Sequence, residues 1–490
     1  MSDFSELLSR FIREKEIRVY PMVNYCGMDR STMYKIINGK RNPPSPEIRD
    51  RMADFMHLTP EENQMFRHAY DISVTGREIY FHRKAVEEFL LNVPSVSELK
   101  DLHLSDISDN CPTPQKNTGL DDISCVPFSD RSSFHFYVQE ILKDAAADKN
   151  GRIGLLLQPD CEFLFDYLTG LQISGCPFHI EHLICLNKAD YIPGEKNFSF
   201  LKGLPRLLSL FINGINYEPY YFYDDLYSHY HNLNAFSSMI LTEDYAILCT
   251  SDYKYGILHH DKPTVSMLWS LFDSYREKCR PLFSVPHNII EECSMVTSVI
   301  TQNPDFYVFE PEPCLVPFID KAYMDRIVPA QAPGREFITE TLRSYLDTSR
   351  SRVLNNDFHF YYCREELELF ADTGILSELP ETFGGFVFSV EERIAILENV
   401  VQNFSRIHFR FLKPPYSRAA ARIRLCAGEA SLYLQFSDVL NRRVYLFPQE
   451  PGLVLSLYDY LRSLGDEQLS SESEAKECMQ QLLQRLRTAL

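Results

Sequence analysis

The sequence predicts a multidomain protein in which an all-α head precedes a larger α/β region with mixed sheets. Three observations lead to this prediction. A chain of 490 residues that is 45% hydrophobic can bury several separate cores. The first seventy-odd residues contain only short stretches with helical spacing of apolar residues. Beyond residue 131, short apolar runs of strand length alternate with amphipathic helical patterns.

Five short helices are predicted in the head. Apolar residues from Phe4 to Ile12 repeat with the spacing of one helix face, and Gly27 can close a second helix in the left-handed conformation. Asp29 is suited to cap a third helix, which Gly39 ends. The last two helices begin after capping residues that are each followed by proline, at Ser45-Pro46 and Thr59-Pro60.

The third helix and the turn after it carry a known pattern. The stretch reads Arg30-Ser31-Thr32-Met33-Tyr34-Lys35-Ile36-Ile37-Asn38-Gly39-Lys40-Arg41, and a proline-bearing loop follows. It resembles the recognition helix of the Cro and phage-repressor-like (XRE) helix-turn-helix family of bacterial transcription regulators. The resemblance covers the head alone.

This resemblance implies that the third helix enters the major groove of double-stranded DNA. Lys40 and Arg41 would then contact the phosphate backbone, which positions the protein without reading sequence. The alternative is a helical bundle that binds protein, which a mostly acidic face on this helix would favour. The residues implied to face base edges and nearby phosphates are Arg30, Ser31, Thr32, Tyr34 and Lys35.

The charge of the chain is distributed unevenly. Its formal net charge is -19, but residues 1–94 hold 14 basic and 14 acidic residues, so the remainder carries the whole excess. Phosphate binding depends on basic residues. A neutral segment with clustered bases can still approach DNA, whereas the acidic remainder would be repelled from it.

The polar, proline-broken stretch 94–131 is the clearest predicted boundary, and we interpret it as a flexible linker. A helical pattern at 77–93 connects it to the head. The predicted divisions are a DNA-binding domain at 1–76, a connecting helix at 77–93, the linker at 94–131, and two α/β effector modules at 132–290 and 291–490.

Two modules are predicted because the stretches 268–273 and 454–459 are similar, and each follows predicted strands and a proline. Duplication of one α/β module would explain the match. The stretch 246–283 is also faintly similar to the last strand and helix of phospholipase-D-like domains, which some regulators retain as inactive ligand sensors.

Enzymes of the phospholipase-D-like class need His-x-Lys and then, after four intervening residues, Asp, because the histidine is the nucleophile and the lysine binds phosphate. His260-Asp261-Lys262 fits the first part, but Met267 stands where the aspartate should be. The sequence has no P-loop, dinucleotide-binding glycine motif or nucleophile elbow. We therefore expect no enzymatic activity and no cofactor. The alternative is a nuclease or phosphodiesterase with a DNA-binding head, which polar residues converging in one pocket of 131–490 would favour.

Two histidine pairs are candidate metal ligands. His179 and His182 lie in a predicted strand, where positions three apart face opposite sides. His229 and His231 lie within an aromatic-rich segment, 217–236, which we interpret as a packing cluster or a ligand-contacting surface. We therefore expect no metal site.

These observations predict a cytoplasmic one-component transcription regulator. The head would bind double-stranded DNA as part of a homodimer, and the effector region would sense a small molecule or dimerise. No apolar run approaches the roughly 18 residues of a membrane span, so no membrane partner is expected. The thirteen cysteines include no Cys-x-x-Cys pair, and we interpret them as reduced, mostly buried thiols.

Overall fold

The structure is a computed structural model, which describes residues 2–93, 124–147, 151–173, 178–188, 197–225, 235–312, 314–332, 334–376 and 386–488. The chain divides into two compact units, Met1–Lys84 and Ala85–Leu490. The division falls within helix α6 (Arg77–Leu91). No helix in the described ranges is long and apolar enough to cross a bilayer.

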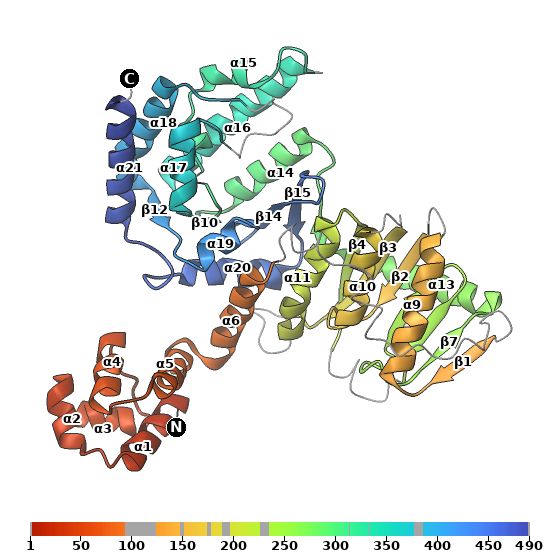
Figure 1. Cartoon of the computed structure of the whole chain (residues 1–490), viewed down its shortest axis with the longest axis horizontal. Helices are drawn as coiled ribbons and strands as arrows, with labels where there is room; N and C mark the ends of the chain where they lie inside the picture. Colours follow the sequence, from red (N-terminus) through yellow and green to blue (C-terminus); the bar gives the residue numbers. More distant parts are fainter. Residues whose placement is uncertain are drawn as a thin grey trace. The chain divides into compact units, whose positions relative to one another are not determined.

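The first unit contains the five predicted helices (Figure 1). Their apolar faces meet in one core, in which the rings of Phe4 and Phe66 lie 4.6 Å apart. Met33 and Ile36 of the third helix are fully buried in the same core. The helices are α1 (Asp3–Glu14), α2 (Val19–Cys26), α3 (Arg30–Ile37), α4 (Pro46–Phe55) and α5 (Pro60–Thr75).

The predicted starts and stops of these helices are confirmed. The Asp29 side chain accepts a hydrogen bond of 2.8 Å from the Thr32 amide and so caps α3. Thr59 and Glu62 form a reciprocal capping box at the start of α5. Gly27 has φ 65° and Gly39 has φ 68°, a left-handed conformation that costs glycine little, so both end their helices with a sharp turn.

The second unit is built around two mixed sheets. The first sheet has the strand order β1-β7-β6-β5-β2-β3-β4-β8, and the second has β12-β11-β10-β13-β14-β15-β9. Strands of the first sheet are β1 (Cys125–Phe128), β2 (Gly151–Leu156), β3 (Phe178–Leu186), β4 (Asn216–Tyr223), β5 (Ser238–Leu241), β6 (Ala246–Cys249), β7 (Gly256–His259) and β8 (Arg280–Pro281). Strands of the second are β9 (Phe283–Ser284), β10 (Asp305–Phe309), β11 (Asp357–Tyr362), β12 (His408–Phe411), β13 (Arg424–Ala427), β14 (Leu432–Ser437) and β15 (Arg443–Pro448).

The two sheets share one topology. In each, three parallel strands (β2, β3, β4 or β10, β11, β12) are followed by an antiparallel meander that pairs with the first of the three. In each, the strand that opens the module, β1 or β9, pairs with the last meander strand. The predicted fold class, an α-helical head followed by two related α/β modules, is therefore confirmed.

Helices cover both faces of each sheet in the same pattern. In the first module α13 (Lys262–Arg276) covers one face, and α9 (Arg131–Ala147), α10 (Glu162–Ile173) and α11 (Phe198–Ile212) cover the other. In the second module α20 (Pro451–Ser463) corresponds to α13. The opposite face packs against α14 (Ile289–Gln302), α16 (Arg335–Asn355), α17 (Arg364–Thr373), α18 (Val390–Gln402) and α21 (Glu472–Thr488), as Figure 1 shows.

The similar stretches 268–273 and 454–459 lie in α13 and α20, the corresponding helices of the two modules. Each helix follows the meander and has a proline in its first turn. The modules also share a core, because the Phe211 ring of α11 lies 5.9 Å from the Phe283 ring of β9. Sequence similarity and topology thus both indicate that the two α/β modules arose by duplication.

Two predicted ranges need correction at their ends. The predicted linker 94–131 lies mostly outside the described residues, but its end contains β1, which pairs with β7. Polar residues on both sides of this short strand hid it in the sequence. The second module begins with β9, before the predicted start at 291, because Phe283 and Ser284 pair with β15. The short pieces η3 (Val316–Phe318), η4 (Lys321–Tyr323), α15 (Met324–Ile327), η6 (Phe404–Arg406) and α19 (Tyr416–Ala420) complete the described fold.

Candidate nucleic-acid interface and polar pocket

The predicted DNA-contacting residues lie on one surface of the first unit. Met33 and Ile36 anchor α3 in the core and Ile37 packs against it, which leaves Arg30, Ser31, Tyr34 and Lys35 exposed. Thr32 is half-buried, and its amide donates a hydrogen bond to the Asp29 side chain that caps α3. The exposed members of the predicted set are Arg30, Ser31, Tyr34, Lys35, Lys40 and Arg41.

The turn after α3 fixes the position of Lys40 relative to the helix. The Lys40 amide donates to the Lys35 carbonyl at 2.8 Å, and the Gly39 amide donates to the Ile36 carbonyl. This pair of bonds is a Schellman motif. The next residue but one, Asn42, donates from its side chain to the Ser73 carbonyl of α5 at 2.7 Å. Lys40 and Arg41 therefore lie on a turn that is anchored at both ends.

Five other bases of the first unit have carboxylate partners, whereas the bases of α3 and its turn, like Arg13, Arg18 and Arg51, take part in none of the ion pairs found among the described residues. Lys15 pairs with Glu62 at 2.7 Å, and Arg49 pairs with Asp50 at 2.9 Å. Arg10, Arg67 and Arg77 also have carboxylate partners. By contrast, none of the ion pairs found among the described residues involves the four bases of the α3 surface, Arg30, Lys35, Lys40 and Arg41.

Aromatic side chains add to this surface. The guanidinium of Arg30 lies 5.6 Å from the centre of the Tyr34 ring, one turn along the helix. Phenolic hydroxyl groups donate to phosphate oxygens, and the rings contact sugars and bases. The surface therefore combines bases that lack carboxylate partners with polar aromatic groups.

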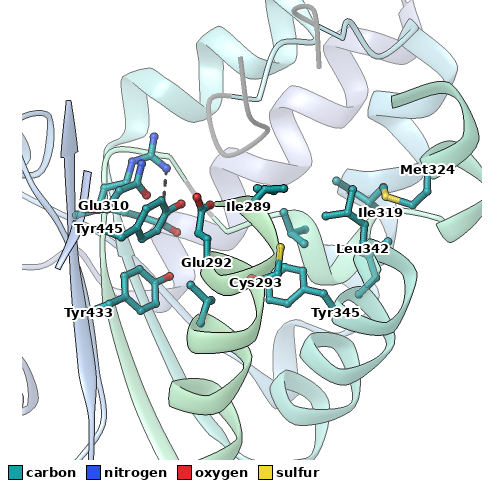
Figure 2. Close-up of a pocket in the computed structure, with 15 residues that line it drawn as sticks. Ile289, Glu292, Cys293, Glu310, Ile319, Met324, Leu342, Tyr345, Tyr433 and Tyr445 are labelled. Atoms are coloured by element: carbon teal, nitrogen blue, oxygen red, sulfur yellow. Dashed lines mark ion pairs between the residues drawn. The ribbon is translucent and has the colours of Figure 1, made fainter. Parts of the chain in front are cut away.

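A second candidate site is a cavity of about 90 Å³ in the second module (Figure 2). It lies between α14, α16 and the face of the second sheet. Figure 2 shows a polar end, which includes Glu292, Glu310 and Tyr445, and an apolar end formed by Ile319, Met324 and Leu342. Polar side chains do converge in one pocket of 131–490.

The polar end is built as one row across four strands. Arg424 of β13 stands opposite Gln435 of β14, which stands opposite Tyr445 of β15. Glu310 directly follows β10 and lies 3.9 Å from the Arg424 guanidinium. These residues are largely buried, which is costly unless polar groups satisfy one another.

Electrostatics in this cavity favour uncharged forms of several groups. Burial raises the pKa of Glu292, although a hydrogen bond from the Tyr445 hydroxyl and the nearby Arg443 oppose the change. Burial also raises the pKa of the Cys293 thiol to about 11, so it stays protonated at neutral pH. A protonated thiol is a weak nucleophile. The cavity is thus suited to hydrogen bonding more than to covalent chemistry.

The sequence did not reveal this pocket. Arg424 and Gln435 occupy inward positions of strands that otherwise bury apolar residues, and that contrast is the one available signal. Glu310 and Glu292 join them only through the strand order and the packing of α14. Neither relation can be read from local spacing.

The His-x-Lys triplet has a structural role. Asp261 caps α13 by accepting a hydrogen bond of 3.0 Å from the Thr264 amide. The His260 ring stacks on Tyr245 with a centroid distance of 4.4 Å. Both contacts support the interpretation that the resemblance of 260–262 to a phosphodiesterase motif is accidental.

The histidine pair in β3 separates as predicted. His182 is fully buried, with Nδ1 2.8 Å from the Tyr217 hydroxyl and Nε2 3.1 Å from the Leu157 carbonyl. His179 faces the other way, with Nε2 3.2 Å from a Glu218 oxygen. His229 and His231 lie outside the described residues. Tyr220, Tyr221 and Tyr223 lie in β4, so that part of the aromatic segment is a strand.

Comparisons with known proteins give only distant likenesses. No protein-family model matches the chain, and no curated protein sequence matches it. Among solved structures, the archaeal chromatin protein TrmBL2, described as showing a novel mode of DNA binding, matches at 13% identity and TM-score 0.23, over 56% of this chain and 99% of that one.

Two enzymes match at a similar level. Polyphosphate kinase from Porphyromonas gingivalis has 11% identity and TM-score 0.23, over 72% of this chain and 50% of that one. Phosphatidylserine synthase from Haemophilus influenzae Rd KW20 has 10% identity and TM-score 0.21, over 75% and 93%. Superpositions as loose as these do not identify a function.

Proposed function

We propose that the chain is a sequence-specific DNA-binding transcription regulator. One observation carries this proposal: Arg30, Lys35, Lys40 and Arg41 are exposed on one helix and its turn, without carboxylate partners among the described residues. A polyanion would supply the missing counter-charge. The acidic remainder of the chain would keep the contact with DNA local to this surface.

The two parts of the surface have different roles in this proposal. Arg30, Ser31, Thr32, Tyr34 and Lys35 read base edges in the major groove, whereas Lys40 and Arg41 hold the phosphate backbone. One short helix offers few base contacts, so specific affinity requires two copies of the head on adjacent half-sites. The functional form is therefore a homodimer.

The α/β unit is the effector region of this regulator. The cavity beside Glu292, Glu310 and Arg424 has room for a small ligand, with hydrogen-bonding groups at one end and apolar side chains at the other. Ligand binding there would change the spacing of the two DNA-binding heads in the dimer. No catalytic step is part of the proposal.

The test is a binding titration with the full chain. Duplexes selected by the protein from a random DNA pool are titrated at two salt concentrations, with wild type and two double variants. Arg30→Ala with Lys35→Ala removes two bases of α3, and Arg67→Ala with Arg77→Ala removes the same charge from α5 and α6. The α3 variant should lose at least tenfold in affinity and lose its preference for the selected sequence.

The control separates local interaction from net charge. The logarithmic salt slope should fall by about two in the α3 variant, roughly one for each base that no longer neutralises a phosphate, and stay unchanged in the control. Equal weakening of both variants, or unaltered binding by the α3 variant, would refute the proposed surface. A head that binds protein would then be the better interpretation.

A second candidate function is phosphodiester hydrolysis by the α/β unit of a chain that also carries a DNA-binding head. The observation in its favour is the convergence of Glu292, Glu310, Arg424 and Gln435 in one pocket. Carboxylates can act as general acids or bases, and arginine can bind phosphate. Hydrolysis of a model phosphodiester that Arg424→Gln abolishes would establish this function.

A further inference from the structure

Two histidines and an aspartate meet at the N-terminal ends of two neighbouring parallel strands. Asp357 is the first residue of β11, and His359 lies two positions later, on the same face of the sheet. His408, the first residue of β12, stands directly beside His359 in the pairing register. The two rings stack with centroids 4.5 Å apart and planes 14° from parallel.

The three ligand-type atoms converge on one point. Oδ1 of Asp357 lies 3.3 Å from Nε2 of His359 and 3.2 Å from Nε2 of His408. All three side chains offer an atom within 4.8 Å of the others. Tetrahedral zinc with bonds of 2.0–2.2 Å places neighbouring ligand atoms roughly 3.3–3.5 Å apart. The two separations from the Asp357 oxygen are close to the edges of such a tetrahedron, and the two histidine nitrogens lie within 4.8 Å of each other.

We propose that Asp357, His359 and His408 form a binding site for a divalent transition-metal ion of the zinc class. Imidazole nitrogen with one carboxylate oxygen suits Zn²⁺ or Co²⁺, whereas Mg²⁺ and Ca²⁺ prefer oxygen ligands. Three protein ligands leave the fourth position open to water or to a ligand. The side chains of Asp357 and His408 are 61% and 41% exposed, so an ion can enter from solvent.

Neighbouring side chains orient the two histidines. Oε1 of Glu472, at the start of α21, lies 2.6 Å from Nδ1 of His408. Metal-bound histidines usually donate their second ring N–H to such a carboxylate, which fixes the tautomer that leaves Nε2 free to coordinate. The His359 ring is stacked on Tyr307 at 4.5 Å, with planes 6° apart. A metal ion lies in the plane of each imidazole that binds it, so the nearly parallel His359 and His408 rings must turn relative to each other before both can bind one ion.

The same contacts have a metal-free interpretation. His408 could donate from both nitrogens, to Asp357 and to Glu472, but only as a protonated imidazolium. His359 could then donate to the same Asp357 oxygen. In that case the set is a small ion-pair network, and it should show no saturable affinity for metal. The two interpretations are distinguished by titration.

The experiment uses the full chain, stripped with a chelator and with accessible thiols alkylated, because free cysteines also bind zinc. Calorimetric titration with Zn²⁺, and with Co²⁺ followed by its visible spectrum, should give one ion per chain at this site. Asp357→Asn and His408→Gln each change a substantially exposed side chain and should weaken binding at least a hundredfold. Glu472→Gln should weaken it by about 10- to 100-fold.

His287→Ala is the matched control, because it removes an exposed histidine of the same module outside the cluster. It should bind like the wild type. Circular dichroism of each variant checks that the fold is retained. Absence of saturable binding in the wild type, or equal binding by the wild type, Asp357→Asn and His408→Gln, would overturn the proposal. Failure of the DNA titration would leave it unaffected, since no residue is shared.

Discussion

On the sheet face that α13 covers, the first module buries Glu181 between Arg152 of β2 and Arg276 of α13. Arg152 also contacts Asp273 at 2.6 Å and lies over the Trp269 ring. The face that α20 covers in the second module carries instead the row Tyr307, His359 and His408. The same topology therefore carries a buried ion-pair network in the first module and a partly exposed set of candidate metal ligands in the second.

The opposite faces differ as well. The first module buries His182 of β3 there, held by Tyr217 and Leu157. In the second module β11 fills the corresponding face with aromatic side chains, and the rings of Phe360 and Phe409 stack at 4.8 Å. A buried polar group depends on its hydrogen bonds, whereas an aromatic stack does not change with pH. The stability of the first module should therefore depend more strongly on pH than that of the second.

The largest expected difference is in acid stability. Burial lowers the pKa of His182 to about 4, from an unfolded value near 6.5. Between these values the unfolded state binds the proton and the folded state does not, so stability falls as pH decreases from about 6.5 to 4. The loss in the first module should approach about 3 kcal/mol. Hydrogen exchange, which resolves the modules separately, measures it.

The control for this prediction is His182→Gln, which keeps a hydrogen-bonding side chain but does not titrate. Exchange in β2 and β3 should then depend much less on pH between 6.5 and 4. If wild type and variant lose protection in parallel, or if the second module opens first, His182 is not the group responsible.

The next effect concerns the charge network of the first module. Glu181 is 1% exposed, and Glu181→Gln removes the counter-charge of two arginines. Because both arginines are about a third exposed and can turn toward water, we expect a loss of about 2 kcal/mol, below the cost of breaking a fully buried pair. His359→Gln in the metal-free second module should cost less than about 1 kcal/mol. Urea-dependent hydrogen exchange compares the two, and equal costs would contradict the difference proposed between the faces.

Much of this fold was accessible from the sequence because its signals are local. Caps at Asp29 and Thr59 and glycines at the ends of α2 and α3 define helices within a few residues. The short apolar runs beyond residue 131 include β2, β3 and β10, since strands covered on both faces are almost wholly apolar. β4 was missed because tyrosines occupy both of its faces and Pro219 lies within it.

The sites were less accessible, because they depend on strand order. Glu310 meets Arg424 because β10 pairs with β13, although β11, β12 and several helices lie between them along the chain. His359 meets His408 because β11 and β12 are parallel neighbours in one register. Contacts between strands separated by such crossover connections cannot be predicted from the spacing of residues along the sequence. The head is the exception, since one helix and its turn carry all its predicted contacts.

The last prediction concerns the start of the corresponding helices. Asp261, which caps α13, is partly exposed. Glu450 caps α20 by accepting a hydrogen bond of 2.6 Å from the Leu453 amide, and it is 3% exposed. Glu450 also accepts a hydrogen bond of 2.7 Å from the Tyr223 hydroxyl of β4. Tyr223→Phe removes that link between the modules and should cost about 1 kcal/mol. Exchange at the first turn of α20 should rise, while α13 stays unchanged. Tyr255→Phe, at another exposed tyrosine, is the matched control, and an equal response to both substitutions would show that the link does not hold α20 in place.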